Sequence, residues 1–89
     1  MTYDLYDILT INDIKYIIIA TYFDDKTQYF LLVELNDYEE IMPKNIKVVK
    51  QSVYNNLDTD ILRPVKDIEE LHKVKKILEG MMKENLKDA

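Results

Sequence analysis

Two runs of sequence decide the fold: Ile14-Lys15-Tyr16-Ile17-Ile18-Ile19-Ala20-Thr21-Tyr22-Phe23 and Gln28-Tyr29-Phe30-Leu31-Leu32-Val33-Glu34-Leu35. Both runs are rich in β-branched and aromatic residues, which suit a pleated and buried surface. The polar tetrapeptide Asp24-Asp25-Lys26-Thr27 separates them, and a short polar link of this kind is typical of an antiparallel hairpin. The sequence therefore predicts two neighbouring strands at residues 14–23 and 28–35.

The first of these strands is apolar on both of its faces, one of which reads Ile14, Tyr16, Ile18, Ala20 and Tyr22. Such a pattern favours either a central strand covered on both sides or a strand that lines a small closed barrel. The strand at residues 28–35 is expected to be more one-sided, because Tyr29, Leu31 and Val33 alternate with a set that contains Gln28 and Glu34.

Shorter segments on either side predict three further strands. Residues 5–11 alternate weakly and precede Asn12-Asp13, and both residue types tolerate the positive φ of a two-residue type I′ turn. Residues 46–50 alternate again and end there or extend to residue 54, whereas Pro43 is expected to end a short element at residues 41–42. Residues 55–60 read as a loop. Residues 61–65 predict a last strand, which Pro64 places at an edge because it lacks an N–H.

A helix is expected to follow. Asp67 can cap its N-terminus while Glu70 reaches back to form a capping box. Gly80 either closes the helix in a left-handed cap or lies inside a helix that continues to about residue 86, which is the interpretation the apolar pattern favours. One face of the helix is expected to carry Ile68, Leu71, Val74, Leu78 and Met81.

These elements predict a single α+β domain over residues 1–89. It would be a small antiparallel meander of about five strands, forming an open sheet or a partly closed barrel, packed by one C-terminal amphipathic helix. Eighty-nine residues are too few for a second hydrophobic core.

Composition excludes several classes of protein. The chain has no cysteine, so disulfides, thiolate nucleophiles and cysteine-ligated zinc are ruled out. The N-terminus lacks the basic and apolar regions of a signal peptide, and no uncharged apolar run approaches the roughly 20 residues of a membrane helix. We therefore expect a cytoplasmic protein with no membrane contact.

The net charge of −5 is unevenly distributed along the chain. Residues 1–40 hold nine acidic and two basic side chains, a net charge of −7, whereas residues 41–66 carry five basic and two acidic side chains, a net charge of +3. Eleven lysines and one arginine provide little for the bidentate recognition of phosphate or bases, which favours arginine. Nucleic-acid binding is therefore not expected.

No constellation of residues points to catalysis. His72 is the single histidine and reads as an exposed helix residue, Ser52 lacks the context of a nucleophile, and one glycine cannot build a phosphate-binding loop. Residues 56–60 resemble the opening of a calcium loop but lack its glycine and its bidentate glutamate, so a turn explains them better. The sequence predicts no enzymatic activity, no metal site and no cofactor.

Three surfaces are candidates for binding a protein partner. Acidic side chains at residues 24–25 and 34–40 either form a solvated surface or imitate a phosphate backbone. Tyr3, Tyr6 and Tyr38 are expected to be exposed, unlike Tyr16, Tyr22 and Tyr29, and the methionines near the helix end offer a soft apolar surface. The candidate partner-binding residues are Asp24, Asp25, Asp37, Tyr38, Glu39, Glu40, Met81 and Met82.

Three segments carry a family resemblance: residues 12–19, residues 27–33, and Asp60-Ile61-Leu62-Arg63-Pro64-Val65-Lys66-Asp67-Ile68-Glu69-Glu70-Leu71. Together they resemble the YrzB-like family of small proteins from low-GC Gram-positive bacteria and their phages. The likeness covers about two thirds of the chain, although Asp13 stands where that family has a glycine. The resemblance implies a host range and a fold, and no mechanism.

Two functional hypotheses follow. The first is a non-enzymatic cytoplasmic module that binds another protein or a second copy of itself. The alternative is an inhibitor, encoded by a phage or mobile element, that uses its acidic surface against a host or defence protein.

Overall fold

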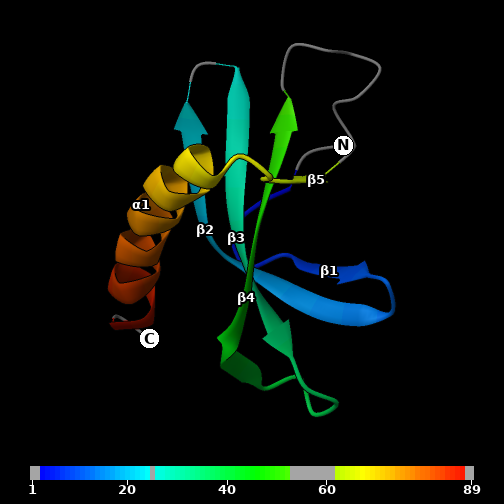
Figure 1. The fold of residues 1–89 in the computed structure, drawn as a ribbon. Helices are drawn as coiled ribbons and strands as arrows, with labels where there is room; N and C mark the ends of the chain where they lie inside the picture. Colours follow the sequence, from blue (N-terminus) through cyan, green and yellow to red (C-terminus); the bar gives the residue numbers. More distant parts are fainter. Residues whose placement is uncertain (1–2, 25, 53–61, 88–89) are drawn as a thin grey trace.

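The computed structural model describes residues 3–24, 26–52 and 62–87. It consists of five strands followed by one helix, and the strands form a single antiparallel sheet in the order β1-β2-β3-β4-β5. The elements are β1 (Ile8–Ile11), β2 (Ile14–Asp24), β3 (Thr27–Leu35), β4 (Ile41–Ser52), β5 (Arg63–Pro64) and α1 (Ile68–Lys87). This confirms the predicted α+β meander, and the sheet curls into a half-barrel, with β1 and the first part of β2 turned away from the direction of β3 and β4 (Figure 1).

The hairpin of β1 and β2 closes through the predicted two-residue turn, where Asn12 and Asp13 have φ angles of 52° and 67°. β1 begins at Ile8 rather than at Leu5, because the chain bulges before it. Tyr6, with φ of 72°, donates its N–H to the carbonyl of Ile18 at 2.7 Å, and the N–H of Ile18 donates to the carbonyl of Asp7 at 3.0 Å. Tyr6 and Asp7 thus both lie opposite Ile18, and such an arrangement of two residues opposite one is a β-bulge, which ends the regular pairing.

β3 is buried on both faces, so the expectation of a more one-sided strand is wrong. Phe30, Leu31, Leu32 and Val33 all have an exposed fraction of 0%. The helix-facing cluster comprises Ala20, Tyr29, Leu31, Val48, Val65, Val74 and Leu78. The opposite cluster comprises Tyr16, Ile18, Phe30, Leu32 and Val49, with Tyr3, Leu9, Ile11 and Leu62 packed against it.

A bulge in β2 distributes its side chains between these two clusters. Ile18 pairs with Leu32 whereas Ala20 pairs with Leu31, so the register shifts around Ile19. The extra residue reverses the alternation of faces. Ile18 consequently packs in the opposite cluster and Ala20 in the helix-facing cluster, and the prediction that both lie on one face is wrong.

β4 runs through Pro43, which was expected to end a separate short element. Val33 pairs with Ile46 and Glu34 pairs with Met42, so residues 43–45 have no partner on β3. A proline in this irregular segment removes no hydrogen bond of the ladder. The strand therefore continues past it.

The second half of the chain follows the prediction in part. β5 is shorter than expected, and Pro64 lies in an edge strand as predicted. The predicted extension of β4 to residue 54, the loop at residues 55–60 and the calcium-like pattern of Asn56, Asp58 and Asp60 lie outside the described residues.

α1 continues through Gly80, as the apolar pattern predicted. The carboxylate of Asp67 accepts hydrogen bonds from the N–H groups of Glu69 and Glu70 at 2.9 and 3.1 Å, which confirms the N-terminal cap. The predicted apolar face is partly wrong, since Ile68 is 71% exposed and Met81 is also exposed. The helix packs instead through Leu71, Val74, Leu78 and Met82.

The assignment of the packed face of α1 predicts that two of its apolar residues differ sharply in their contribution to stability. Leu78→Ala should lower the free energy of unfolding by about 2–5 kcal/mol, because Leu78 is fully buried. Ile68→Ala should change it by less than about 0.5 kcal/mol. Urea unfolding followed by circular dichroism measures both values, and a comparable loss in the two variants would contradict the assigned helix face.

Gly80 faces open space, and no atom lies within 4 Å of the position that a Cβ would occupy. Gly80→Ala should therefore raise the free energy of unfolding by about 1 kcal/mol, because alanine loses less backbone entropy in a helix. For a domain of this size the thermal midpoint should rise by about 4–8 °C. A thermal melt tests this, and an unchanged or lower midpoint would show that Gly80 is not inside a regular exposed helix.

Candidate functional site

Residues 36–40, here called the Tyr38 turn, connect β3 to β4 and are held by hydrogen bonds within the turn. The side-chain Oδ1 of Asn36 accepts from the N–H groups of Tyr38 and Glu40, both at 2.9 Å. Its Nδ2 donates to Oε1 of Glu40 at 3.2 Å, and the N–H of Asn36 donates to the carbonyl of Glu40 at 2.9 Å. The side chain of Asn36 thus accepts hydrogen bonds from the N–H groups of Tyr38 and Glu40 in place of a backbone carbonyl, and it fixes the shape of the turn.

A cross-strand ion pair connects the turn to β2. Nζ of Lys15 lies 3.2 Å from Oε1 of Glu39, and Glu39 adopts a left-handed φ of 60°. Both side chains are more than half exposed, so the pair adds little to stability. The pair shows that the Tyr38 turn lies beside the β1–β2 hairpin. Tyr38 itself is 84% exposed.

An acidic hollow lies beside the turn. Asp13, Glu34 and Asp37 line it together with Lys15, and Lys15 is already paired with Glu39. Residues from the first hairpin, from β3 and from the turn therefore meet at one end of the sheet. The structure brings together Asp37, Tyr38, Glu39 and Glu40 of the predicted partner-binding residues. Glu34, which belongs to the predicted acidic surface of residues 34–40, lies beside them, and the structure adds Asp13.

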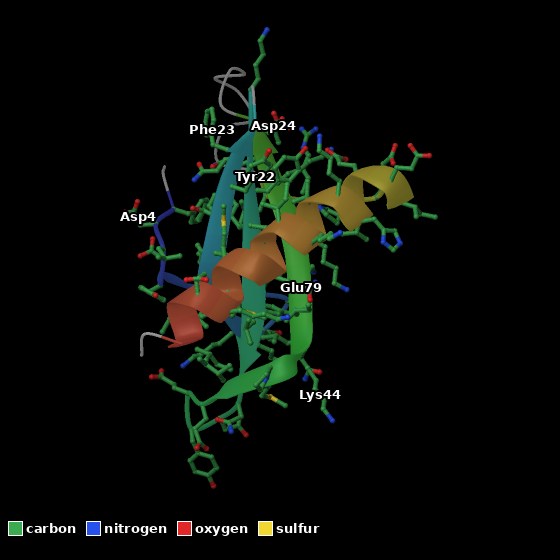
Figure 2. All side chains as sticks on the ribbon, turned by 90° about the vertical axis from the view of Figure 1, so that its left-hand side faces the viewer. Asp4, Tyr22, Phe23, Asp24, Lys44 and Glu79 are labelled. Carbon is green, nitrogen blue, oxygen red and sulfur yellow. The ribbon has the colours of Figure 1, made fainter. Side chains whose placement is uncertain are left out.

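The other predicted partner-binding residues lie elsewhere. Asp24 is at the opposite end of β3, as Figure 2 shows by placing it far from Lys44 of β4, and Asp25 lies outside the described residues. Met81 is exposed on α1, whereas Met82 is half-buried against the helix-facing cluster. The predicted residues therefore do not form one continuous surface.

Glu70 is part of a second polar group, between α1 and the sheet. Its carboxylate accepts a hydrogen bond of 2.5 Å from the hydroxyl of Tyr29, and Nζ of Lys50 lies 3.1 Å from Oε1 and 3.3 Å from Oε2. The prediction that Glu70 reaches back to Asp67 is wrong, because these partners from β3 and β4 bind both of its oxygens. The group fastens the first turn of α1 to the sheet.

The pKa values of this group shift for identifiable reasons. The hydrogen bond from Tyr29 lowers the pKa of Glu70, and Lys50 lowers it further, against the opposing effect of burial. Burial raises the pKa of Tyr29 well above its usual range, and the hydrogen bond to the Glu70 carboxylate adds to this effect. Both pKa shifts favour the hydrogen-bonded pair, in which Glu70 is ionised and Tyr29 keeps its proton. They are therefore explained by a contact that holds the structure together.

Other reactive side chains of the described chain do not converge. His72 is exposed on α1, as predicted, and in the described ranges no three His, Cys, Asp or Glu residues are grouped in a way that could hold a metal ion. Gln51 is buried, and its Nε2 makes no hydrogen bond within the described structure. Across residues 3–24, 26–52 and 62–87 we find no helix with the length and apolar character needed to cross a membrane.

Tyrosine placement follows the prediction with one exception. Tyr16 and Tyr29 are buried, Tyr22 is half-buried, and Tyr38 is exposed. Tyr3 is the exception, because its ring packs edge-on against Phe30 with centroids 6.0 Å apart.

Comparison with protein-family models, with curated proteins and with solved structures finds no match for this chain. None of these comparisons bears on the resemblance to the YrzB-like family, which stays a prediction.

The Glu70 group predicts a stability difference that depends on pH. Because the pKa of Glu70 is lower in the folded chain than in the unfolded one, its stabilisation is present above the usual pKa of glutamate and is lost as the pH falls through the folded value. Glu70→Gln should therefore be less stable than the wild type by about 1 kcal/mol at neutral pH, and the difference should shrink in acid.

Urea unfolding at a series of pH values measures this difference, with Glu69→Gln, an exposed neighbour, as the matched control. A difference for Glu70→Gln that stays constant from neutral to acidic pH would contradict the assigned role of the carboxylate.

Proposed function

We propose that this protein is a non-enzymatic interaction module that binds another protein through the Tyr38 turn. The observation that carries the proposal is the 84% exposure of Tyr38 on a turn whose backbone is fixed by Asn36. Tyrosine is enriched among the residues that dominate binding energy at interfaces. A turn that is already ordered loses less conformational entropy when it binds.

The surroundings of Tyr38 favour a partner of defined chemistry. Asp37, Glu39 and Glu40 flank the ring in sequence, and Asp13 and Glu34 lie in the adjoining hollow. We infer a partner with an apolar slot for the phenol ring and lysine or arginine side chains around it, since charge complementarity speeds association and selects partners. The absence of cysteine supports a cytoplasmic location.

The acidic hollow also favours the second candidate function, an inhibitor encoded by a phage or mobile element. Three carboxylates line the hollow, those of Asp13, Glu34 and Asp37, and Glu39 and Glu40 extend the acidic surface along the turn. In this case charge, rather than the ring of Tyr38, would supply most of the binding energy to a host or defence protein.

The first test uses the purified chain as bait in a cell lysate. Tyr38→Ala should remove a specifically captured protein without changing the thermal midpoint, because the exposed ring makes little contribution to folding. Phe23→Ala is the matched control, since Phe23 is another exposed aromatic residue at the opposite end of the sheet. Retention of the captured protein by Tyr38→Ala would reject the Tyr38 turn as the binding site.

The second test separates the two functions with the captured partner. A doubly neutralised variant, Asp37→Asn with Glu40→Gln, should weaken binding modestly if the ring of Tyr38 dominates. Strong loss in this variant, together with steep weakening of wild-type binding by salt, would favour the acidic inhibitor instead.

A further inference from the structure

β1 lies at an open edge of the sheet. It pairs with β2 on one side, and the described residues place no strand on its other side. The two-residue turn determines which backbone groups of β1 face outward. Ile11 and Ile14 flank the turn and form a pair that exchanges both backbone hydrogen bonds. Along the ladder, hydrogen-bonded pairs then alternate with pairs that are not hydrogen-bonded. Leu9 therefore bonds to Tyr16, whereas Ile8 and Thr10 direct their N–H and C=O groups away from β2.

The four residues of β1, Ile8-Leu9-Thr10-Ile11, include no charged side chain, proline or bulge of the kind that blocks pairing between molecules. The short length of β1 is the protective feature that remains. Ile8 is 50% exposed, and Leu5 and Tyr6 beside it are exposed as well. The bulge at Tyr6–Asp7 confines the open edge to these four residues of β1.

We propose that β1 pairs in antiparallel fashion with β1 of a second copy of this chain, around a two-fold axis at Leu9. In this register Ile8 of each copy faces Thr10 of the other, so the outward N–H and C=O groups of both residues find partners. Leu9 faces its own counterpart, and Asp7 faces Ile11. No like charges are opposed across this pairing, which would otherwise destabilise it.

The opposite edge of the sheet explains why the pairing closes at two copies. β5 has two residues, one of which is Pro64, and proline has no N–H to donate to a ladder. Among the described residues, β5 covers only residues 49–50 of β4, and the uncovered part of β4 carries Pro43, Lys44 and Lys47, which are residues that discourage pairing at an edge. β1 of one molecule therefore finds no unprotected strand at this edge of another. Pairing of β1 with β1 of a second copy uses the same surface on both molecules, so it ends with a dimer. Pairing of β1 with the opposite edge of the next molecule would leave free edges at both ends and would produce a fibre.

The small size of the edge sets the strength of the dimer. A pairing of four residues with the neighbouring Leu5 and Tyr6 covers less surface than the roughly 1,000 Å² of a stable interface. The dimer is consequently weak and depends on concentration. It does not involve the Tyr38 turn, so Tyr38→Ala leaves it unchanged and the two proposals fail independently.

Nuclear magnetic resonance of the full-length, ¹⁵N-labelled chain over a dilution series tests this proposal. At high concentration the amides of Ile8 and Thr10 should shift and exchange more slowly with solvent, while those of Leu9 and Ile11 stay protected throughout. Sedimentation should show the weight-average mass falling towards that of a monomer on dilution.

Ile8→Lys should abolish both effects by placing a charge at the edge. Thr10→Lys provides a second variant, at another exposed position, in case the first disturbs folding. Phe23→Lys is the control, because it adds the same charge to an exposed aromatic position distant from β1, and it should dimerise like the wild type. Amides of Ile8 and Thr10 that do not respond to dilution, or a dimer that survives both edge variants, would overturn the proposal.

Discussion

Burial of β3 on both faces is the constraint on which the rest of the structure depends. A strand with four consecutive residues at 0% exposure, Phe30 to Val33, must be covered from two directions, yet the part of the chain that the structure describes contains one helix. α1 covers one face. The curled β1–β2 hairpin and the segment before it cover the other, and this is why the sheet becomes a half-barrel instead of remaining flat (Figure 1).

The bulge at Ile19 makes this double coverage feasible. Because the register of β2 shifts there, its first part contributes Tyr16 and Ile18 to the opposite cluster and its second part contributes Ala20 to the helix-facing cluster. A bulge also increases the local twist and bends the strand. One irregular residue thus supplies both the change of face and the change of direction.

Local sequence signals predicted much of this architecture. The runs at residues 14–23 and 28–35, the Asn12-Asp13 turn and the cap at Asp67 each depend on neighbours in sequence, and all were recovered. The errors concern features set by distant partners. Nothing local to Ile19 indicates a bulge. Glu70 does not form the expected capping box, because Tyr29 and Lys50 of the sheet bind its carboxylate. Ile68 is 71% exposed and does not belong to the helix-facing cluster.

The candidate site was predictable in composition and not in geometry. The sequence predicted an acidic surface around an exposed Tyr38, but it did not predict how the segment is held. The role of Asn36 in fixing the shape of the turn depends on side-chain hydrogen bonds that no spacing rule indicates. The meeting of Asp13 and Glu34 at the same end follows from strand register. The same register places Asp24 at the far end of β3 and so divides the acidic surface that the sequence suggested.

The central claim, that β2 changes face at Ile19, can be tested directly by methyl nuclear Overhauser measurements on the folded chain. The account predicts contacts from the Ile18 methyls to the ring of Phe30 and from the Ala20 methyl to Val74 and Leu78 of α1. Contacts from both Ile18 and Ala20 to the same cluster would show an unbroken alternation in β2 and would contradict the account.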